Sequence, residues 1–462
     1  MIPDATIVLD IGKTNCKLSL IDAAGQCLTE RRCPNTIATD GPYPHHDVER
    51  LWAWMLAGFS EFAGLARIGA IVPVTHGATA ALVDDDGLVL PVLDYECSLP
   101  DEPGSDYPGL RPPFAQTQSP ALPAGLNLGR QIAWLARRFP AEFGRARHLL
   151  MYPQFWAWRL SGVAASEVTS LGCHTDLWSP AADDYSALVE QQGWRALFPP
   201  RRPAWAKLGP IKPELAAATG LPGDCQIICG IHDSNASLLR YLVPAPDQPA
   251  PQPCTVLSTG TWVIVASLGG AAAALQEGQD MLANCDVFGA PVACMRFMGG
   301  REFAALAGTE SAAFEPADLA RLIARRTLAL PSFADSGGPF AGRVGRIDGP
   351  PPDSPAEQAA LATLYVVLMT DFCLTALAAE SPVMVEGSFT RNSYFGPLLA
   401  ALRPGQRVAV SDDGSGTTCG GWMLHRWGRL PAAHARPVAA LELPGWATYR
   451  RQWRDAVTGL LQ

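Results

Sequence analysis

The chain has 462 residues, of which 48% are hydrophobic and 17% charged, so it is long enough for two domains and too apolar to be disordered. Its formal net charge of -9 argues against general binding to nucleic acid or to an anionic membrane. The N-terminus lacks the regions of a signal peptide, and the twelve cysteines form no Cys-x-x-Cys pair. We therefore expect a cytoplasmic protein with reduced cysteines.

A proline-rich segment divides the sequence. Residues 244–253 contain five prolines, which are incompatible with a helix or a central strand. Strands and helices recur on both sides of this linker, which indicates two α/β domains. The predicted boundaries are an N-terminal domain at 1–243, the linker at 244–253, a C-terminal domain at 254–435 and a tail at 436–462.

Hydrophobic periodicity and turn signals place the elements in chain order. In the first domain we expect strands within 6–33, a helix at 47–66, a strand at 70–74, a hairpin at 80–93, a surface excursion at 98–125, helices at 127–139 and 151–161, and a strand at 226–229. In the second we expect a hairpin at 255–266, helices near 302–308, 316–326 and 356–379, a strand at 382–386, a helix near 396–402, a strand at 407–410 and a helix starting within 414–421.

The most apolar long run is 361–379, which is long enough to span a bilayer. It contains Asp371, and a carboxylate in the middle of a span is costly in lipid. We therefore expect a buried helix of an α/β domain.

The first chemical motif is a tight turn between two short apolar strands, starting at Asp10. Gly12 allows backbone N–H groups to approach a phosphate, Thr14 and Asn15 offer side-chain donors, and Asp10 suits a magnesium ion held through water. The run Gly12-Lys13-Thr14 is not a P-loop, because the required upstream glycine is Ile7 and a strand follows instead of a helix.

A similar hairpin follows the linker, with Ser258-Thr259-Gly260-Thr261 between two apolar strands. One phosphate-type hairpin at the front of each half indicates a duplicated architecture that closes on a nucleotide.

Asp233 follows a buried strand and precedes a helix, which is where open α/β sheets place their ligands. It could accept the proton of an attacking hydroxyl, as the base does in phosphoryl transfer. A helix cap is the alternative for Asp233, and a packed histidine is the alternative for His232 beside it.

Two further stretches contain small residues at a strand's end. Gly387 and Ser388 suit a shelf for adenine or ribose, and Asn392 could hydrogen-bond the nucleotide. A strand-to-helix loop is the plainer interpretation. For the glycines of 414–421 the plainer interpretation is close helix packing.

Together these motifs resemble the FGGY family of carbohydrate kinases over residues 6–430. The resemblance rests on Asp-x-Gly-x-Thr-x-x-Lys from Asp10 to Lys17, Gly-x-x-Asp-x-x-Ala at 230–236, Ser-Thr-Gly-Thr at 258–261, the adenosine motif with Asn392, and a closing segment near 412–421. It implies two actin-like (ribonuclease H-like) α/β domains with a nucleotide cleft between them, and ATP and Mg2+ as cofactors.

The resemblance also implies roles for individual residues. Asp233 would be the catalytic base, and Asp10 with Asp233 would form the magnesium site. The phosphate and nucleotide residues would be Asp10, Gly12, Thr14, Asn15, Lys17, Thr259, Gly260, Thr261, Gly387, Ser388 and Asn392. Ser388 departs from the family's usual second glycine.

The sugar site is expected after the strand at 70–74. Thr75, His76 and Gly77 are similar to a Thr-aromatic-Gly segment of rhamnulokinase-like and fuculokinase-like members, with His76 in place of the aromatic residue. His232 is shared with the rhamnulokinase-like branch. Asp94 and Glu96 could each bind sugar hydroxyls, and a solvated loop carboxylate is the alternative for both. The expected substrate is a ketose or 6-deoxy-ketose of the L-rhamnulose, L-fuculose or xylulose type.

Two other classes stay open beside the kinase: a non-catalytic nucleotide sensor or partner module, and an actin-like ATPase that drives a partner. The retained Asp233 argues against the first. The second would need a cysteine cluster or a peptide-binding domain that the sequence does not contain. The expected partners are the sugar and ATP, without nucleic acid or membrane, and a homodimer is left open.

Overall fold

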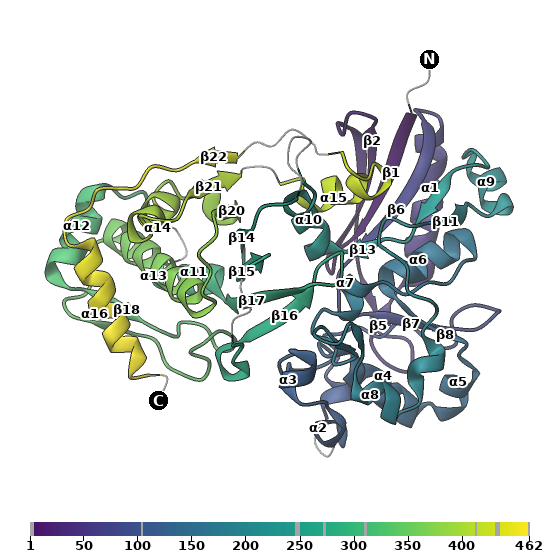
Figure 1. Ribbon diagram of the computed structural model, residues 1–462, viewed down its shortest axis with the longest axis horizontal. Coiled ribbons are helices and arrows are strands. Elements are labelled where there is room, and N and C mark those ends of the chain that lie inside the picture. The colour runs from purple at the N-terminus through teal and green to yellow at the C-terminus, as the bar shows by residue number, and fades with distance from the viewer. Residues whose placement is uncertain are drawn as a thin grey trace. The chain divides into compact units, whose positions relative to one another are not determined.

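The computed structural model describes residues 4–102, 105–244, 250–270, 274–308, 312–411, 414–429 and 435–460 (Figure 1). The chain forms two compact units. Unit 1 consists of Met1–Pro251, Ala283–Pro291 and Ser415–Ala432, and unit 2 of Gln252–Leu282, Val292–Gly414 and Ala433–Gln462. This division differs from the boundaries drawn on the sequence, because 415–432 groups with unit 1 and the expected tail groups with unit 2. Residues 245–249 of the linker, 412–413 of the closing segment and 461–462 of the tail lie outside the described residues.

Unit 1 is built on a mixed sheet with the strand order β11-β12-β6-β1-β2-β3, and β13 also pairs with β6. β6 is parallel to β1, β12 and β13, whereas β1-β2, β2-β3 and β11-β12 are antiparallel. The strands are β1 (Asp4–Ile11), β2 (Asn15–Asp22), β3 (Cys27–Pro34), β6 (Arg67–Thr75), β11 (Lys207–Pro210), β12 (Gln226–Ile228) and β13 (Ile231–His232).

The alternation of side chains along β1 assigns its two faces. Ile7, Leu9 and Ile11 are fully buried in a core with helices α1 and α6. Val8, on the opposite face, contacts α15, where a Cβ on Gly421 would lie 2.6 Å from it. The helices of this unit are α1 (Val48–Ala63), α4 (Leu128–Arg138), α5 (Pro140–Arg145), α6 (Tyr152–Ser161), α8 (Ala187–Gln191), α9 (Pro213–Thr219), α10 (Asp233–Leu242), α15 (Gly416–His425) and the one-turn α2 (Tyr107–Leu110), α3 (Phe114–Thr117) and α7 (Val168–Leu171).

The segment 98–125, expected as a surface excursion, has many exposed residues among those described, but part of it packs into a second core of unit 1. Tyr107 is 1% exposed in that core, and its hydroxyl donates to Asp176 at 2.7 Å. The hairpin-like turn expected within 80–93 is present: the Asp84 N–H donates to the Gly87 carbonyl at 2.9 Å, and an antiparallel bridge joins Val83 to Leu88. The longer ladder of β7 (Ala80–Val83) is formed with β8 (His148–Met151). A local turn signal does not show which distant strand completes a ladder.

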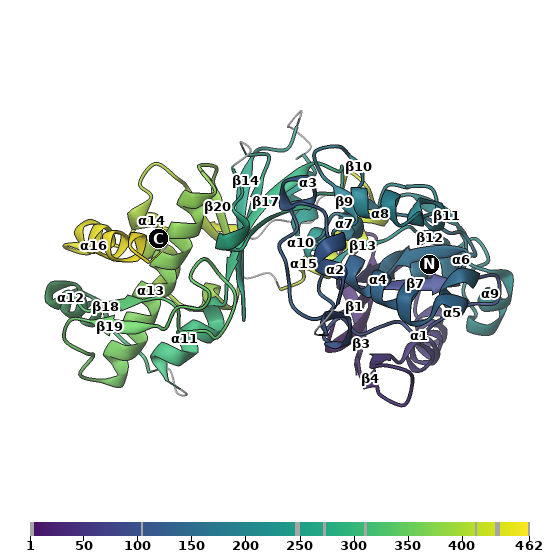
Figure 2. The ribbon, with the colours of Figure 1, turned by 90° about the horizontal axis from the view of Figure 1, so that it is seen from below.

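Unit 2 contains a second seven-stranded sheet, ordered β16-β17-β15-β14-β20-β21-β22. The strands are β14 (Cys254–Thr259), β15 (Val263–Leu268), β16 (Met281–Cys285), β17 (Pro291–Phe297), β20 (Val383–Gly387), β21 (Val408–Ser411) and β22 (Ala435–Pro437). The labelled helices of this unit lie on one side of the sheet in two perpendicular views (Figures 1 and 2). They are α11 (Gly299–Ala307), α12 (Pro316–Arg325), α13 (Pro355–Ala376), α14 (Phe395–Leu402) and α16 (Trp446–Thr458).

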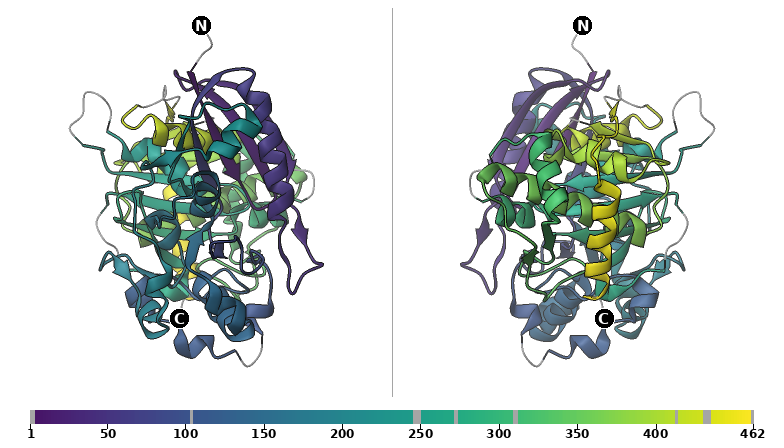
Figure 3. Two further views of the ribbon diagram at one scale, coloured as in Figure 1. Left: turned by 90° about the vertical axis from the view of Figure 1, so that its right-hand side faces the viewer. Right: turned by 90° about the vertical axis from the view of Figure 1, so that its left-hand side faces the viewer.

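The apolar run that invited a membrane interpretation is α13. It is long and apolar enough to cross a bilayer, but 83% of its most apolar window is buried inside the structure. The yellow C-terminal helix α16 runs along the face shown on the right of Figure 3, and Trp446, Tyr449 and Trp453 bury their rings in the same core as α13. The segment expected as a tail therefore contains a helix that completes this core.

Candidate active site

The β1-β2 turn holds the first group of predicted residues. Strand register places Asp10 opposite Lys17, and their side chains form an ion pair at 3.5 Å. The Gly12 N–H donates to the Asn15 carbonyl at 2.9 Å, and a Cβ on Gly12 would lie 3.0 Å from that oxygen. Gly12 therefore closes the turn through its own N–H. Thr14 and Asn15 are exposed at the tip.

Asn35, which the sequence analysis missed, braces this turn. Its side-chain amide donates to the Gly12 carbonyl at 2.8 Å and its backbone N–H to the Thr14 carbonyl at 2.9 Å. A lone asparagine just after a strand carries no sequence signal for this role.

The sheet brings Asp10 and Asp233 to the same edge. Asp10 lies opposite Val74 of β6, and Val74 is also opposite Ile231 of β13, so Asp233 follows the carboxyl end of a parallel strand. Asp233 is the first residue of α10, and His232, not Asp233, is its N-cap. The Asp233 carboxylate accepts the Ser234 N–H at 2.6 Å, and its side chain is 30% exposed.

The two carboxylates affect each other's ionisation. Burial raises the pKa of Asp10 to about 6; the positive charge of Lys17 opposes this rise, and the negative charge of Asp233 adds to it. Burial also raises the pKa of Asp233. Two partly desolvated carboxylates with a shared repulsion suit a magnesium ion, which takes one or two carboxylates and completes its shell with water and phosphate oxygens. Within the described residues no group of three or more His, Cys, Asp or Glu side chains could hold a metal ion.

His232 contacts the Asp233 carboxylate at 3.2 Å through Nε2. Burial lowers the pKa of His232 to about 4, so the ring is neutral at pH 7 and this contact is not an ion pair. Asn235 lies 3.3 Å from the other ring nitrogen, Nδ1, and Thr169 Oγ1 accepts the backbone N–H of His232 at 3.1 Å. The neutral imidazole and its neighbours thus fix the orientation of the carboxylate.

Two of the residues expected to bind the sugar, His76 and Gly77, lie beside His232 and Asp233. The ring of His76 is 5% exposed, it lies 5.2 Å from Tyr152 and 5.5 Å from Tyr95 between ring centroids, and its Nε2 has no hydrogen-bond partner among the described residues. Gly77 lies against His232, where a Cβ would come 2.9 Å from Nε2. Thr75 is fully buried, which suits packing better than contact with a sugar.

Asp94 and Glu96 are not bare carboxylates. Lys13, which we had not assigned to the site, contacts Asp94 and lies 3.2 Å from Glu96. Its ammonium lies 4.9 Å from the centroid of the Tyr95 ring. The sequence separates Lys13 from these partners by about 80 residues, so only the fold could pair them.

Gly416, Gly420 and Gly421 belong to α15 and serve helix packing, the plainer of the two interpretations, whereas Gly414 precedes the helix and has nothing within 4 Å of its Cβ position. A Cβ on Gly420 would lie 2.0 Å from the Ala236 carbonyl oxygen of α10. Ser237 and Thr417 add a hydroxyl–hydroxyl hydrogen bond at 3.2 Å between the two helices. Because α10 begins at Asp233, this close packing sets the position of the carboxylate.

Unit 2 holds the second group of predicted residues. In the β14-β15 hairpin, the Thr259 hydroxyl accepts the Phe389 N–H at 3.0 Å and donates to the Glu386 carbonyl, so it is tied into the fold. Gly387 packs against the same strand, with a Cβ position only 2.0 Å from the Thr259 carbonyl oxygen. Thr261 is exposed, and Gly260 packs on Gly300 at the start of α11.

Ser388 and Asn392 line a pocket of about 730 Å³ within unit 2. Its volume is in the range of small-molecule sites. The Asn392 amide is already engaged, since it donates to Thr363 at 2.9 Å and accepts the Tyr394 N–H at 3.0 Å. The sequence analysis missed the other main lining residues, which are Gly300, Phe303, Phe314, Glu315, Arg391 and Tyr394.

Known proteins match both a part of the chain and nearly all of it. A family model described as the C-terminal domain of FGGY carbohydrate kinases matches residues 251–434. The structure of a carbohydrate kinase from Novosphingobium aromaticivorans matches 98% of this chain and 100% of its own, with 36% identity and a TM-score of 0.91. None of the curated proteins compared matches the sequence.

More distant structures share the fold. A ligand-bound xylulose kinase from Lactobacillus acidophilus has a TM-score of 0.78 and 15% identity, with 99% of this chain and 98% of that chain covered. A Plasmodium falciparum glycerol kinase with ADP has a TM-score of 0.77 and 12% identity, with 100% and 99% covered.

Proposed function

Because the chain belongs to the FGGY family of carbohydrate kinases, we propose that it transfers the γ-phosphate of ATP to a hydroxyl of a ketose or 6-deoxy-ketose, with Asp233 as the general base. The observation that carries the proposal is the placement of Asp233 directly after the carboxyl end of β13, beside His76 and His232. Asp10 lies at the same edge of the sheet.

The chemistry asks the protein mainly for positioning and charge. Asp233 accepts the proton of the sugar hydroxyl while the hydroxyl oxygen of the sugar forms a bond to the γ-phosphorus. The bond between the γ-phosphorus and the bridging oxygen breaks, and ADP leaves with its electrons. The neutral His232 keeps the carboxylate of Asp233 oriented without supplying a charge that would weaken it as a base.

Asp10 and Asp233 would hold Mg2+, which when bound neutralises charge on the phosphate oxygens. Lys17 balances Asp10 in the ligand-free chain. Thr14 and Asn15 supply exposed donors for phosphate at the tip of the first hairpin, and Thr261 does so at the second.

The unit 2 pocket is proposed as the adenosine site. Phe314 and Tyr394, whose ring centroids are 4.9 Å apart, provide apolar faces for a flat base. Ser388 is the polar residue at the pocket that the sequence pattern identified. Since the Asn392 amide is already hydrogen-bonded within unit 2, its contribution is to shape the pocket wall, and Gly387 lies outside the lining.

The substrate class rests on unit 1. Tyr95 offers an aromatic edge beside His76, while the Asp94 carboxylate and the Nε2 of His76, which has no partner among the described residues, offer polar contacts to neighbouring hydroxyls. Tyr152 is fully buried and supports the His76 ring from behind. The xylulose and glycerol kinases share the fold at 12–15% identity, which is too low to indicate a substrate. The proposed substrate class is therefore argued from the residues of unit 1 and not from these two structures.

The test is an ADP-release assay with Mg2+-ATP across ketoses, aldoses and polyols, run beside Asp233→Asn. Sugar-dependent turnover that falls by roughly 10²- to 10⁴-fold in the variant, with little change in sugar KM, is expected. Full activity of Asp233→Asn would reject the base. Tight ATP binding without turnover on any sugar would favour a nucleotide sensor.

A further inference from the structure

Lys13 connects two parts of unit 1 that the proposed function treats separately. It stands in the β1-β2 turn between Gly12 and the exposed Thr14, where phosphate donors are expected. Its ammonium contacts Asp94 in the loop expected to bind sugar hydroxyls. One cation is thus within reach of a phosphate and already paired with a sugar-site carboxylate.

Burial ranks the partners of Lys13. The side chains of Lys13 and Asp94 are 16% and 7% exposed, whereas that of Glu96 is 66% exposed. An ion pair to a largely solvated carboxylate contributes little, so Asp94 is the partner that holds the ammonium. The ammonium of Lys13 also lies over the Tyr95 ring, so a cation–π contact stabilises it in this position.

Among the described residues, the other cationic side chains near the β1-β2 turn have partners of their own, as Arg32 does in Glu30. Lys17 is paired with Asp10. Burial holds the pKa of His46 well below its usual value, so its ring is neutral at pH 7. The exposed donors Thr14 and Asn15 are uncharged.

We propose, on the basis of the proposed kinase function, that Lys13 is a phosphate-binding residue whose availability is set by the sugar. Without sugar, Asp94 holds the ammonium. When sugar hydroxyls donate hydrogen bonds to Asp94, the carboxylate is satisfied, and the flexible lysine stem can carry the ammonium to the phosphate. Sugar binding then strengthens nucleotide binding, and by linkage the nucleotide strengthens sugar binding by the same factor.

The decisive measurement needs no sugar. Calorimetric titration of the full chain with Mg2+ and a β,γ-imido analogue of ATP compares wild type, Asp94→Asn, Lys13→Met and the double variant. Asp94→Asn frees the ammonium, so it should bind the analogue more tightly than wild type, by at least about 5-fold, the lower end of usual coupling factors. The double variant should lose this gain.

Two outcomes would overturn the proposal. Equal analogue affinity in wild type and Asp94→Asn would mean that Asp94 does not restrain Lys13. A gain that persists in the double variant would mean that it arises from another residue. Lys207→Met, on an exposed residue of β11, is the matched control and should bind like wild type. Thermal midpoints check folding, with Lys13→Gln as a second neutral variant.

A second arm adds the ketose with the highest turnover. Wild type should bind the analogue more tightly with sugar than without, Lys13→Met should show a ratio near one, and Lys13→Arg should retain part of the effect. If Lys13→Met raises the KM for sugar but leaves the ratio of analogue affinities with and without sugar as in wild type, then Lys13 supports the sugar site structurally and does not couple the two ligands. Failure of every sugar to turn over rejects the sugar-kinase proposal, while the sugar-free comparison still decides the role of Lys13.

Discussion

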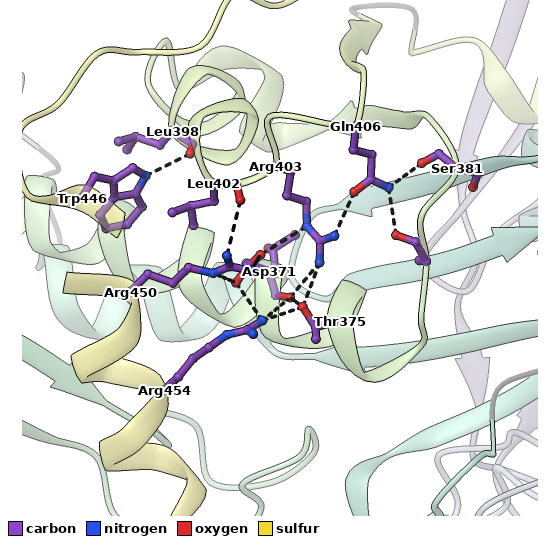
Figure 4. A network of polar contacts seen from close by, with 12 residues as sticks. Asp371, Thr375, Ser381, Leu398, Leu402, Arg403, Gln406, Trp446, Arg450 and Arg454 are labelled. Carbon is purple, nitrogen blue, oxygen red and sulfur yellow. Dashed lines mark hydrogen bonds and ion pairs between the residues drawn. The ribbon is translucent and has the colours of Figure 1, made fainter. Parts of the chain in front are cut away.

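Asp371, buried near the C-terminal end of α13, accepts two hydrogen bonds at 2.7 Å from the guanidinium of Arg450 on α16 (Figure 4). Arg403 and Arg454 also reach this carboxylate, at 3.2 and 3.0 Å. Burial lowers the pKa of both these arginines, which nevertheless stay charged near their counter-ion. The carboxylate that argued against a membrane helix is thus the anchor of the C-terminal helix.

Asp371→Asn should destabilise the protein by about 3–5 kcal/mol, because it leaves three partly buried arginines without their counter-charge. Urea unfolding measures the change. Asp348→Asn, on an exposed strand residue of the same unit, is the control and should stay within about 0.5 kcal/mol. A loss at Asp371 as small as that of the control would mean that the arginines find other partners.

The pH dependence of kcat/KM should have an acidic limb to which Asp233 and Asp10 both contribute, because burial raises the pKa of each. The pKa of Asp10 is raised to about 6, so this carboxylate is ionised above that pH and protonated below it. Because only the ionised form binds Mg2+, activity should fall as the pH drops through about 6, and saturating Mg2+ should move the limb to lower pH. His232, with a pKa of about 4, does not titrate in this window. A limb that ignores Mg2+ would contradict the role of Asp10.

Gly420→Ala should lower both stability and kcat. The added Cβ would lie 2.0 Å from a backbone oxygen of α10, so α15 or α10 must shift, at a cost of about 1–3 kcal/mol. Since α10 begins at Asp233, the base shifts with it. Gly414→Ala, in the same glycine run but with nothing within 4 Å of its Cβ, is the matched control. Thermal unfolding and steady-state kinetics of both variants decide; identical behaviour would refute the packing argument.

Ser388→Tyr should raise the KM for ATP at least about 10-fold by filling the unit 2 pocket, with little change in the KM for sugar. The same substitution at Ser336, an exposed residue of this unit outside the pocket lining, controls for added bulk and should leave both constants unchanged. An unaltered KM for ATP in Ser388→Tyr would place adenosine elsewhere.

Most of the helices and the family could be predicted from the sequence, whereas α16 and the pairing of β7 with β8 could not. Apolar periodicity located α1, α4, α6, α12 and α13 within a few residues, because each buries one face or is apolar all round. Short motifs with a local cause also held: a turn between two strands around Gly12, and an acidic residue directly after a buried strand at Asp233. The FGGY kinase family followed from their order.

Which side chains pair with one another could be learned only from the folded structure. Lys13 and Asp94, Asn35 and Gly12, and Asp371 and Arg450 are distant in sequence, and no local pattern encodes their contacts. The sequence favours a strand-to-helix loop at Gly387 and helix packing at Gly420, and the backbone oxygens beside both show close packing. The physical reason is that propensity and periodicity act over one helix turn or one strand, whereas pairing, burial and pKa depend on what the rest of the chain brings alongside.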